Sequence, residues 1–252
     1  MYMRFVQARY KPHSLSEIRK IYEGSIIPRL QTIPGCLCVC LIRRDLPKDE
    51  GISLTLWDSR EHAEDYEKSG VFKELLDKVK PYLSDSSEWK MELSKDLVLE
   101  YKPVPEEPVV TSYVGLAQAE GKLPSHEETS SLYLRILSIK VKPGKMEEFR
   151  KIYVDEIIPA LHDVKGCRYA FLTENTKKEN EGISVTLWDS KEDADAYERN
   201  MIFDRLTKKI EHTFADVYQW KAVLEKKFSG RVITSEDPKV RTYEVVTGRS
   251  FQ

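Results

Sequence analysis

Hydroxyl groups and aromatic rings are concentrated on one predicted strand of this sequence and on the helix that follows it. Polar and apolar residues alternate along 51–57, which puts Ser53, Thr55 and Trp57 on one face and aliphatic side chains on the other. Hydroxyls that point inward from a covered sheet must be hydrogen-bonded or line a cavity. Tyr66 lies on the apolar stripe of the next predicted helix, where a buried phenol needs a polar partner. These four are candidate substrate-pocket residues, and packing in an ordinary core is the alternative.

The whole pattern occurs twice. Residues 4–93 match residues 135–224 without a gap at an offset of 131, with identity at a little over a third of the positions. Two copies of about 115 residues each indicate a duplicated domain rather than a solenoid of short repeats. In the second copy the candidate pocket residues are Ser184, Thr186, Trp188 and Tyr197.

The other residue types that do chemistry form no catalytic or metal-binding pattern. The five histidines fall at unmatched positions of the two copies and have no ligand spacing. Cys36, Cys38 and Cys40 alternate along one predicted strand, so we expect them to share a face and to be buried and reduced. The sequence has no Gly-rich phosphate loop and no nucleophile elbow. We therefore expect no metal and no cofactor, and the sequence identifies no catalytic base.

Each copy predicts the element order βαββαβ, a ferredoxin-like unit of the α+β class. Ser14 and Glu17 form a capping box before the first helix, which should end or kink near Pro28. Ser59 is the expected N-cap of the second helix, and its counterpart is Ser190. The strands of the first copy are expected at 4–10, 36–42, 51–57 and 89–93, and the last of these is repeated at 220–224.

Both copies continue past this unit into a Pro-led segment, at 106–113 and 236–243, which predicts an edge strand or an exchanged strand. The polar, turn-rich stretch between the copies predicts a linker. The expected domains are a first repeat at 1–116, the linker at 117–131 and a second repeat with a C-terminal strand at 132–252.

A sheet with both helices on one side leaves its other side bare. Two such sheets that face each other would cover one another. We therefore expect the repeats to pack sheet to sheet as an intrachain pseudo-dimer, with a higher homo-oligomer left open. In the first strand, Gln7 and Arg9 are expected to add polar groups to the pocket face. Arg4 and Arg135 are identical between the copies, and a salt bridge at the rim is favoured over anion binding.

The composition excludes several classes of function. The chain has 252 residues, 33% of them charged, and a formal net charge of −2. Its charges alternate in sign and show no basic excess, so nucleic acid is not an expected partner. No apolar run is long enough to span a membrane, and the N-terminal residues predict a strand rather than a signal peptide. The prediction is a cytoplasmic protein that binds a small molecule.

With this pattern assembled, the chain resembles the antibiotic biosynthesis monooxygenase superfamily, the dimeric α+β barrel proteins. The resemblance covers both repeats. The resemblance implies an intrachain version of that barrel. It indicates the fold more specifically than the activity. The residues that carry it are Pro34-Gly35-Cys36, Thr55-Leu56-Trp57-Asp58-Ser59, Glu61, Ala63, Tyr66, Ser69 and Phe72, with Gly166-Cys167, Thr186 to Ser190, Glu192, Ala194, Tyr197 and Phe203 in the second copy.

Two branches of the superfamily have pocket residues that can be compared with this chain. In the haem-degrading branch, the resemblance implies a pocket with an Asn on the first strand and a Trp and a His on the second helix. In this chain the His position holds Leu76 in the first copy and Thr207 in the second. Haem is therefore not expected. In the cofactor-free oxygenase branch, the resemblance implies a pocket with an Asn, a Trp and a Tyr around the end of the third strand. The Trp is present as Trp57 and Trp188, but serine and alanine replace the other two residues.

The resemblance implies a cofactor-independent monooxygenase that acts on a small aromatic or phenolic substrate. In this hypothesis the two tryptophans wall the cavity, the tyrosines supply hydroxyls, and the strand hydroxyls orient the substrate. A non-catalytic small-molecule-binding or stress-response protein is the alternative class, and a haem-binding or haem-degrading oxygenase is the second alternative.

Overall fold

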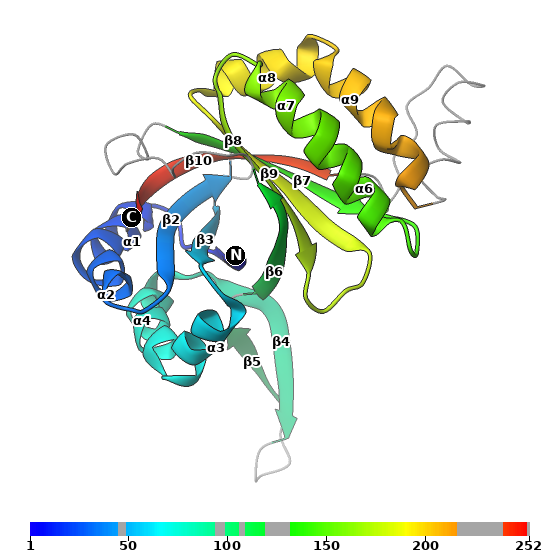
Figure 1. The fold of residues 1–252 in the computed structure, drawn as a ribbon. Helices are drawn as coiled ribbons and strands as arrows, with labels where there is room; N and C mark the ends of the chain where they lie inside the picture. The colour runs from blue at the N-terminus through cyan, green and yellow to red at the C-terminus, as the bar shows by residue number, and fades with distance from the viewer. Residues whose placement is uncertain (45–48, 94–98, 106–108, 119–131, 216–238, 251–252) are drawn as a thin grey trace. The chain divides into compact units, whose positions relative to one another are not determined.

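The computed structural model describes residues 1–44, 49–93, 99–105, 109–118, 132–215 and 239–250 (Figure 1). The chain forms two compact units. The first comprises Met1–Thr111 together with Val245–Gln252, and the second comprises Ser112–Glu244. Among the described helices, none is long and apolar enough to cross a membrane.

The first unit is built on a three-stranded antiparallel sheet with β3 in its centre. On one side β3 pairs with β1, so that Arg4 lies opposite Thr55 and Val6 opposite Ser53. The helical elements between and after these strands supply a second layer. The sheet strands are β1 (Tyr2–Arg9), β2 (Cys36–Arg44) and β3 (Glu50–Trp57), and the helical elements are α1 (Leu15–Ile21), η1 (Tyr22–Ile26), α2 (Ile27–Gln31), α3 (Arg60–Lys68), α4 (Val71–Val79) and η2 (Lys80–Tyr82).

The second unit repeats this arrangement and adds a strand at each edge of its sheet. Its strand order is β10-β7-β9-β8-β6, and every pairing is antiparallel. The helices of this unit lie on one face of the sheet (Figure 1). The strands are β6 (Val109–Gln118), β7 (Tyr133–Lys140), β8 (Cys167–Asn175), β9 (Glu181–Trp188) and β10 (Lys239–Ser250), and the helical elements are α6 (Met146–Ile152), η3 (Tyr153–Ile157), α7 (Ile158–His162), α8 (Lys191–Arg199), α9 (Ile202–Ile210) and η4 (Glu211–Thr213).

The two ferredoxin-like repeats of the α+β class are confirmed, and the structure adds detail at their ends. The predicted fourth strand lies within β4 (Asp85–Leu93), but it pairs with β5 (Leu99–Pro105) in a separate two-stranded sheet. Its counterpart at 220–224 lies outside the described residues. The strand that follows the first repeat, β6, pairs with β8 of the second repeat, as an exchanged strand would. The sheet-to-sheet packing of the repeats stays a prediction.

The first helix of the first repeat differs from the expectation at its start. The predicted capping box is wrong, because the Ser14 hydroxyl donates to the carbonyls of Lys11 and Tyr82 instead of accepting from the helix. The helix also continues past Pro28 to Gln31. A wider π-helical turn, η1, precedes the proline, which has no N–H to donate, and η3 repeats this turn in the second copy.

The second predicted helix is confirmed at its start and interrupted in its middle. Ser59 and Ser190 accept hydrogen bonds from the backbone N–H groups of His62 and Asp193, as N-cap residues do. The helix then breaks into α3 and α4 at Gly70, where φ is +81°. In the second repeat Met201 takes the same left-handed conformation, with φ of +58°.

The three cysteines of β2 are buried and free, but they do not share one face. A β-bulge between Cys36 and Cys38 shifts the alternation by one residue. Cys36 therefore packs with Val39 and Leu41 in the core beneath the helices. Cys38 and Cys40 lie on the opposite face, with their sulfurs 3.7 Å apart.

Candidate functional site

A cavity lies between the helix layer and the sheet of the first unit. Its volume is about 80 Å³, counted as space open to the centre of a water molecule, which is room for several waters or a small organic ligand. The sheet contributes the residues of β1 and β3 whose side chains point toward the helices. The walls are mostly aliphatic and aromatic, and the polar side chains among them belong to Arg4, Tyr10, Tyr22, Ser53, Thr55 and Tyr66.

One of the cavity's hydroxyls is held by a hydrogen-bond partner, and Tyr22, the first residue of the π-helical turn, places its phenol near Ser53. The Thr55 hydroxyl accepts a hydrogen bond of 2.9 Å from the indole N–H of Trp57. Burial raises the pKa of the Tyr22 phenol well above its usual value, so it stays protonated at neutral pH. Ser53 and Thr55 line the cavity, as the alternation of the strand predicted.

Tyr66 places a phenol in the cavity wall without a hydrogen-bond partner for its hydroxyl among the described residues. Its ring lies 5.1 Å from the Trp57 ring and 6.1 Å from the Phe72 ring, which fixes its orientation. Burial raises the pKa of this phenol, and the nearby Arg4 charge opposes the shift. Tyr66 is therefore positioned to donate a hydrogen bond to a ligand in the cavity.

Arg4 is the charged residue of this wall, and it is only 2% exposed. Its Nε and Nη2 atoms have no hydrogen-bond partner within the part of the chain that the structure describes. The guanidinium carbon lies 3.9 Å from the centre of the Phe72 ring, a cation–π contact, and Nη2 lies 3.6 Å from a carboxylate oxygen of half-exposed Glu67. The salt bridge predicted for Arg4 is thus a long one, and the guanidinium is buried against the cavity rather than at a rim.

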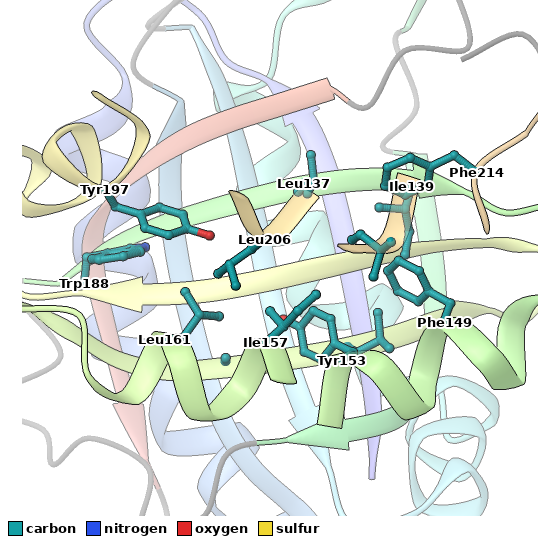
Figure 2. Close-up of a cluster of buried hydrophobic side chains, with 14 of the residues drawn as sticks. Leu137, Ile139, Phe149, Tyr153, Ile157, Leu161, Trp188, Tyr197, Leu206 and Phe214 are labelled. Atoms are coloured by element: carbon teal, nitrogen blue, oxygen red, sulfur yellow. The ribbon is translucent and has the colours of Figure 1, made fainter. Parts of the chain in front are cut away.

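The second unit has a cavity at the equivalent place, but its volume is only about 30 Å³. Larger side chains occupy four of its lining positions. Figure 2 shows three of these residues, Leu137, Ile139 and Phe149, in the buried cluster between helices and sheet. The replacements are Leu137 for Val6, Ile139 for Ala8, Phe149 for Ile18 and Ile210 for Val79.

The polar groups of the second cavity are also more fully paired. The Arg135 Nε donates to Oε1 of Glu198 at 2.8 Å, and Nη2 lies 2.8 Å from the same oxygen, at an angle too poor for a second hydrogen bond. The salt bridge predicted for Arg135 is confirmed. The Tyr153 phenol and the Ser184 hydroxyl are hydrogen-bonded at 2.8 Å. Tyr197 keeps a phenol in the wall, and burial raises its pKa to about 12.

The structure brings together six of the eight predicted pocket residues, three in each cavity: Ser53, Thr55 and Tyr66 in one, Ser184, Thr186 and Tyr197 in the other. The prediction for the two tryptophans needs correction. Trp57 and Trp188 are fully buried and line neither cavity, because each indole packs behind a tyrosine ring and donates to a threonine.

The expectation for the first strand was also wrong in part. Gln7 and Arg9 do not line the cavity, since the side chains that do so are those of Arg4, Val6, Ala8 and Tyr10. Sequence reasoning missed Arg4 as a pocket residue, although the alternation through Val6 and Ala8 reaches back to it. It also missed Tyr22, for which the signal was its place on the same helical stripe as Ile18 and Ile26.

Comparisons with known proteins agree with this fold. Residues 132–209 match the family model described as antibiotic biosynthesis monooxygenase. A search of curated proteins finds no match to the sequence. Among solved structures, a candidate monooxygenase from Fusobacterium nucleatum superposes with a TM-score of 0.67 at 10% identity, covering 99% of this chain and 94% of the other.

Two further solved structures share the fold over nearly the whole length. A candidate monooxygenase from Lactobacillus acidophilus has a TM-score of 0.66 at 10% identity, with coverage of 99% of this chain and 96% of that one. A structure described as an anthrone oxidase-like protein has a TM-score of 0.59 at 14% identity, with coverage of 99% and 93%. At these identities the likeness concerns the fold.

Proposed function

Since its second repeat is an antibiotic biosynthesis monooxygenase domain, we propose that this chain is a cofactor-independent monooxygenase that acts on a small phenolic substrate in the cavity of the first repeat. One observation carries the proposal. That cavity combines apolar walls with the hydroxyl of Tyr66, which has no hydrogen-bond partner among the described residues, beside the hydroxyls of Tyr22 and Ser53. An apolar pocket with a few convergent polar groups is the usual form of a small-molecule site.

The reaction class needs no electrons from outside the substrate. A phenolic substrate with an activated CH₂ group, RH₂, reacts with O₂ to give the quinone-type ketone RO and water. One oxygen atom forms the new C=O bond, the O–O bond breaks, and the other oxygen leaves as water with the two hydrogens. The substrate must first lose a proton, because its anion is the species that reacts with O₂.

The residues of the cavity suit the stabilisation of such an anion. Burial raises the pKa of Tyr66 and keeps its phenol protonated, so Tyr66 would donate a hydrogen bond to the substrate oxygen. Arg4 would add a positive charge beside apolar walls, where a charge interacts more strongly than in bulk water. The cavity does not fit haem, because apolar Leu76 occupies the position of the expected histidine ligand and the volume is only about 80 Å³.

A second candidate function is binding of a small molecule without chemistry. One specific observation favours it: among the described residues that line the first cavity there is no aspartate, glutamate or histidine. The substrate would then have to ionise before it binds or pass its proton to water. Turnover measurements separate the two functions.

Replacement of a single hydroxyl tests the proposal. Tyr66→Phe should lower the rate of oxygen uptake about 100-fold, because loss of one donor to a developing oxyanion costs about that much. The matched variant Tyr197→Phe in the second repeat should leave the rate within about two-fold of wild type. Oxygen consumption is measured with a panel of anthrones and other phenols that carry an activated CH₂ group, with a chelator present and no flavin added.

The result that would overturn the oxygenase proposal is the absence of uptake above the uncatalysed rate with every member of the panel, while a phenol still binds. If uptake occurs but both tyrosine variants act as wild type, the role assigned to Tyr66 is wrong. Far-ultraviolet circular dichroism and thermal unfolding of each variant show whether the fold is retained.

A further inference from the structure

We infer that the cavity of the first repeat takes a small aromatic carboxylate, which Arg4 binds side-on through Nε and Nη2, one molecule per chain. This inference deepens the proposed function, and it rests on that function for the role of the ligand as a substrate. Binding of the ligand can be tested separately, because it is measured without turnover.

The state of Arg4 is the first argument. The Arg4 side chain is 2% exposed, so its guanidinium has lost most of its hydration. Among the described residues, no hydrogen-bond acceptor replaces the lost water at Nε and Nη2. The Phe72 ring at 3.9 Å covers one face of the group, and a ring face takes no hydrogen bond from the edge. Glu67, 3.6 Å from Nη2, is 54% exposed and too far for a hydrogen bond. The edge of the guanidinium is therefore desolvated and, among the described residues, without a hydrogen-bond acceptor.

The second repeat shows which group approaches this edge and pairs with Nε. At the equivalent position Arg135 is 3% exposed, with its ring contact to Phe203 at 4.4 Å. There, a carboxylate oxygen of Glu198 lies 2.8 Å from both Nε and Nη2. Glu198 is the counterpart of Glu67, so the same ion pair is close in the second repeat, whereas in the first repeat Glu67 stays 3.6 Å away and Nε and Nη2 of Arg4 have no hydrogen-bond partner among the described residues. A planar carboxylate is the group that matches this fork of two donors.

The walls of the cavity decide what the carboxylate is attached to. Ala8, Leu41, Leu75 and Phe72 surround the space, so a hydrated inorganic anion would lose its water without compensation. An aromatic ring would fill the apolar space, and a phenol on that ring would be able to reach the Tyr66 hydroxyl. The second cavity, at about 30 Å³ and with Arg135 already paired, is expected to stay empty.

Isothermal titration of the full chain with 4-hydroxybenzoate tests the inference. The expected result is one bound molecule per chain, with an affinity at least about ten-fold higher than that for the neutral isostere 4-hydroxybenzamide. Arg4→Met should weaken 4-hydroxybenzoate binding about 10- to 100-fold. Arg4→Lys keeps the charge but loses the pair of guanidinium donors, so its affinity should lie between those of wild type and Arg4→Met. Glu67→Gln should tighten binding, because it removes the competing charge.

Arg135→Met is the matched control and should bind within about two-fold of wild type. Equal binding of the acid and the amide, two equivalent sites per chain, or equal losses in the Arg4 and Arg135 variants would overturn the inference. So would preference for ionised 4-nitrophenol over the carboxylate. If Arg4→Met does not fold, the wild-type comparison decides, since 4-hydroxybenzoate should raise the melting temperature and the amide should not. Carboxylate binding without oxygen uptake would reject the oxygenase alone.

Discussion

At the scale of single residues, the two repeats keep the same structural bonds and differ in the groups that face the cavity. The indole of Trp57 donates to Thr55 at 2.9 Å, and that of Trp188 donates to Thr186 at 2.8 Å. Both indoles are fully buried, so each bond satisfies a donor that water cannot reach. This conserved geometry explains the tryptophans by packing rather than by contact with a substrate.

Thr55→Val removes the acceptor and keeps the shape of the side chain. We expect it to lower the free energy of unfolding by about 1–3 kcal/mol, because the indole N–H is left buried without a partner. Thr186→Val should cost a similar amount, whereas Thr55→Ser retains the hydroxyl and should cost less. Urea unfolding followed by tryptophan fluorescence measures all three. An equal loss for Thr55→Val and Thr55→Ser would mean that the hydrogen bond contributes little.

At the scale of elements, the turn before β2 and the π-helical turn before α2 position the cavity. Gly35 has φ of +76°, and an added Cβ would lie 2.2 Å from Nδ1 of His62. His62 in turn contacts the Asp58 carboxylate at 2.7 Å, which raises the pKa of the imidazole and lowers that of the carboxyl. This turn therefore ties the start of β2 to the start of α3.

Two glycine substitutions with opposite expected signs test this account of the turn. Gly35→Ala should destabilise the chain by about 1–3 kcal/mol, since it forces a left-handed conformation on alanine and displaces His62. Gly24→Ala, in the exposed π-helical turn with nothing near the added Cβ, should be neutral or stabilising by up to about 1 kcal/mol. Thermal unfolding gives both values. A tolerated Gly35→Ala would show that the turn can adopt another conformation.

Sequence patterns predicted the elements well where the physical cause is local. Alternation placed Ser53 and Thr55 on the cavity face, and the N-caps at Ser59 and Ser190 followed from residue type and spacing. Most of the failures have causes that lie elsewhere in the chain. The Ser14 hydroxyl donates to the carbonyl of Lys11 close by as well as to that of distant Tyr82, whereas the bulge after Cys36 depends on pairing with β3. The pairing of β4 with β5 is likewise set by tertiary structure rather than by the local sequence of β4.

At the scale of the whole molecule, duplication has given two sites with different capacities. The repeat was evident from the sequence, and so was divergence at Leu76 and Thr207, which both line their cavities. The sequence did not reveal which repeat keeps the larger space, because that depends on volumes summed over four lining positions and on the pairing of one arginine. The second repeat, whose residues 132–209 match the family model, has the smaller cavity, and its arginine is paired with Glu198.

The most direct test of the central claim, that the first cavity is the functional site, is to fill it with the residue of the second repeat. Ala8→Ile copies Ile139 and adds apolar volume without removing a polar group. We predict that oxygen uptake and 4-hydroxybenzoate binding both fall at least about ten-fold while the melting temperature stays close to that of wild type. Wild-type uptake and binding in a folded Ala8→Ile variant would contradict the account.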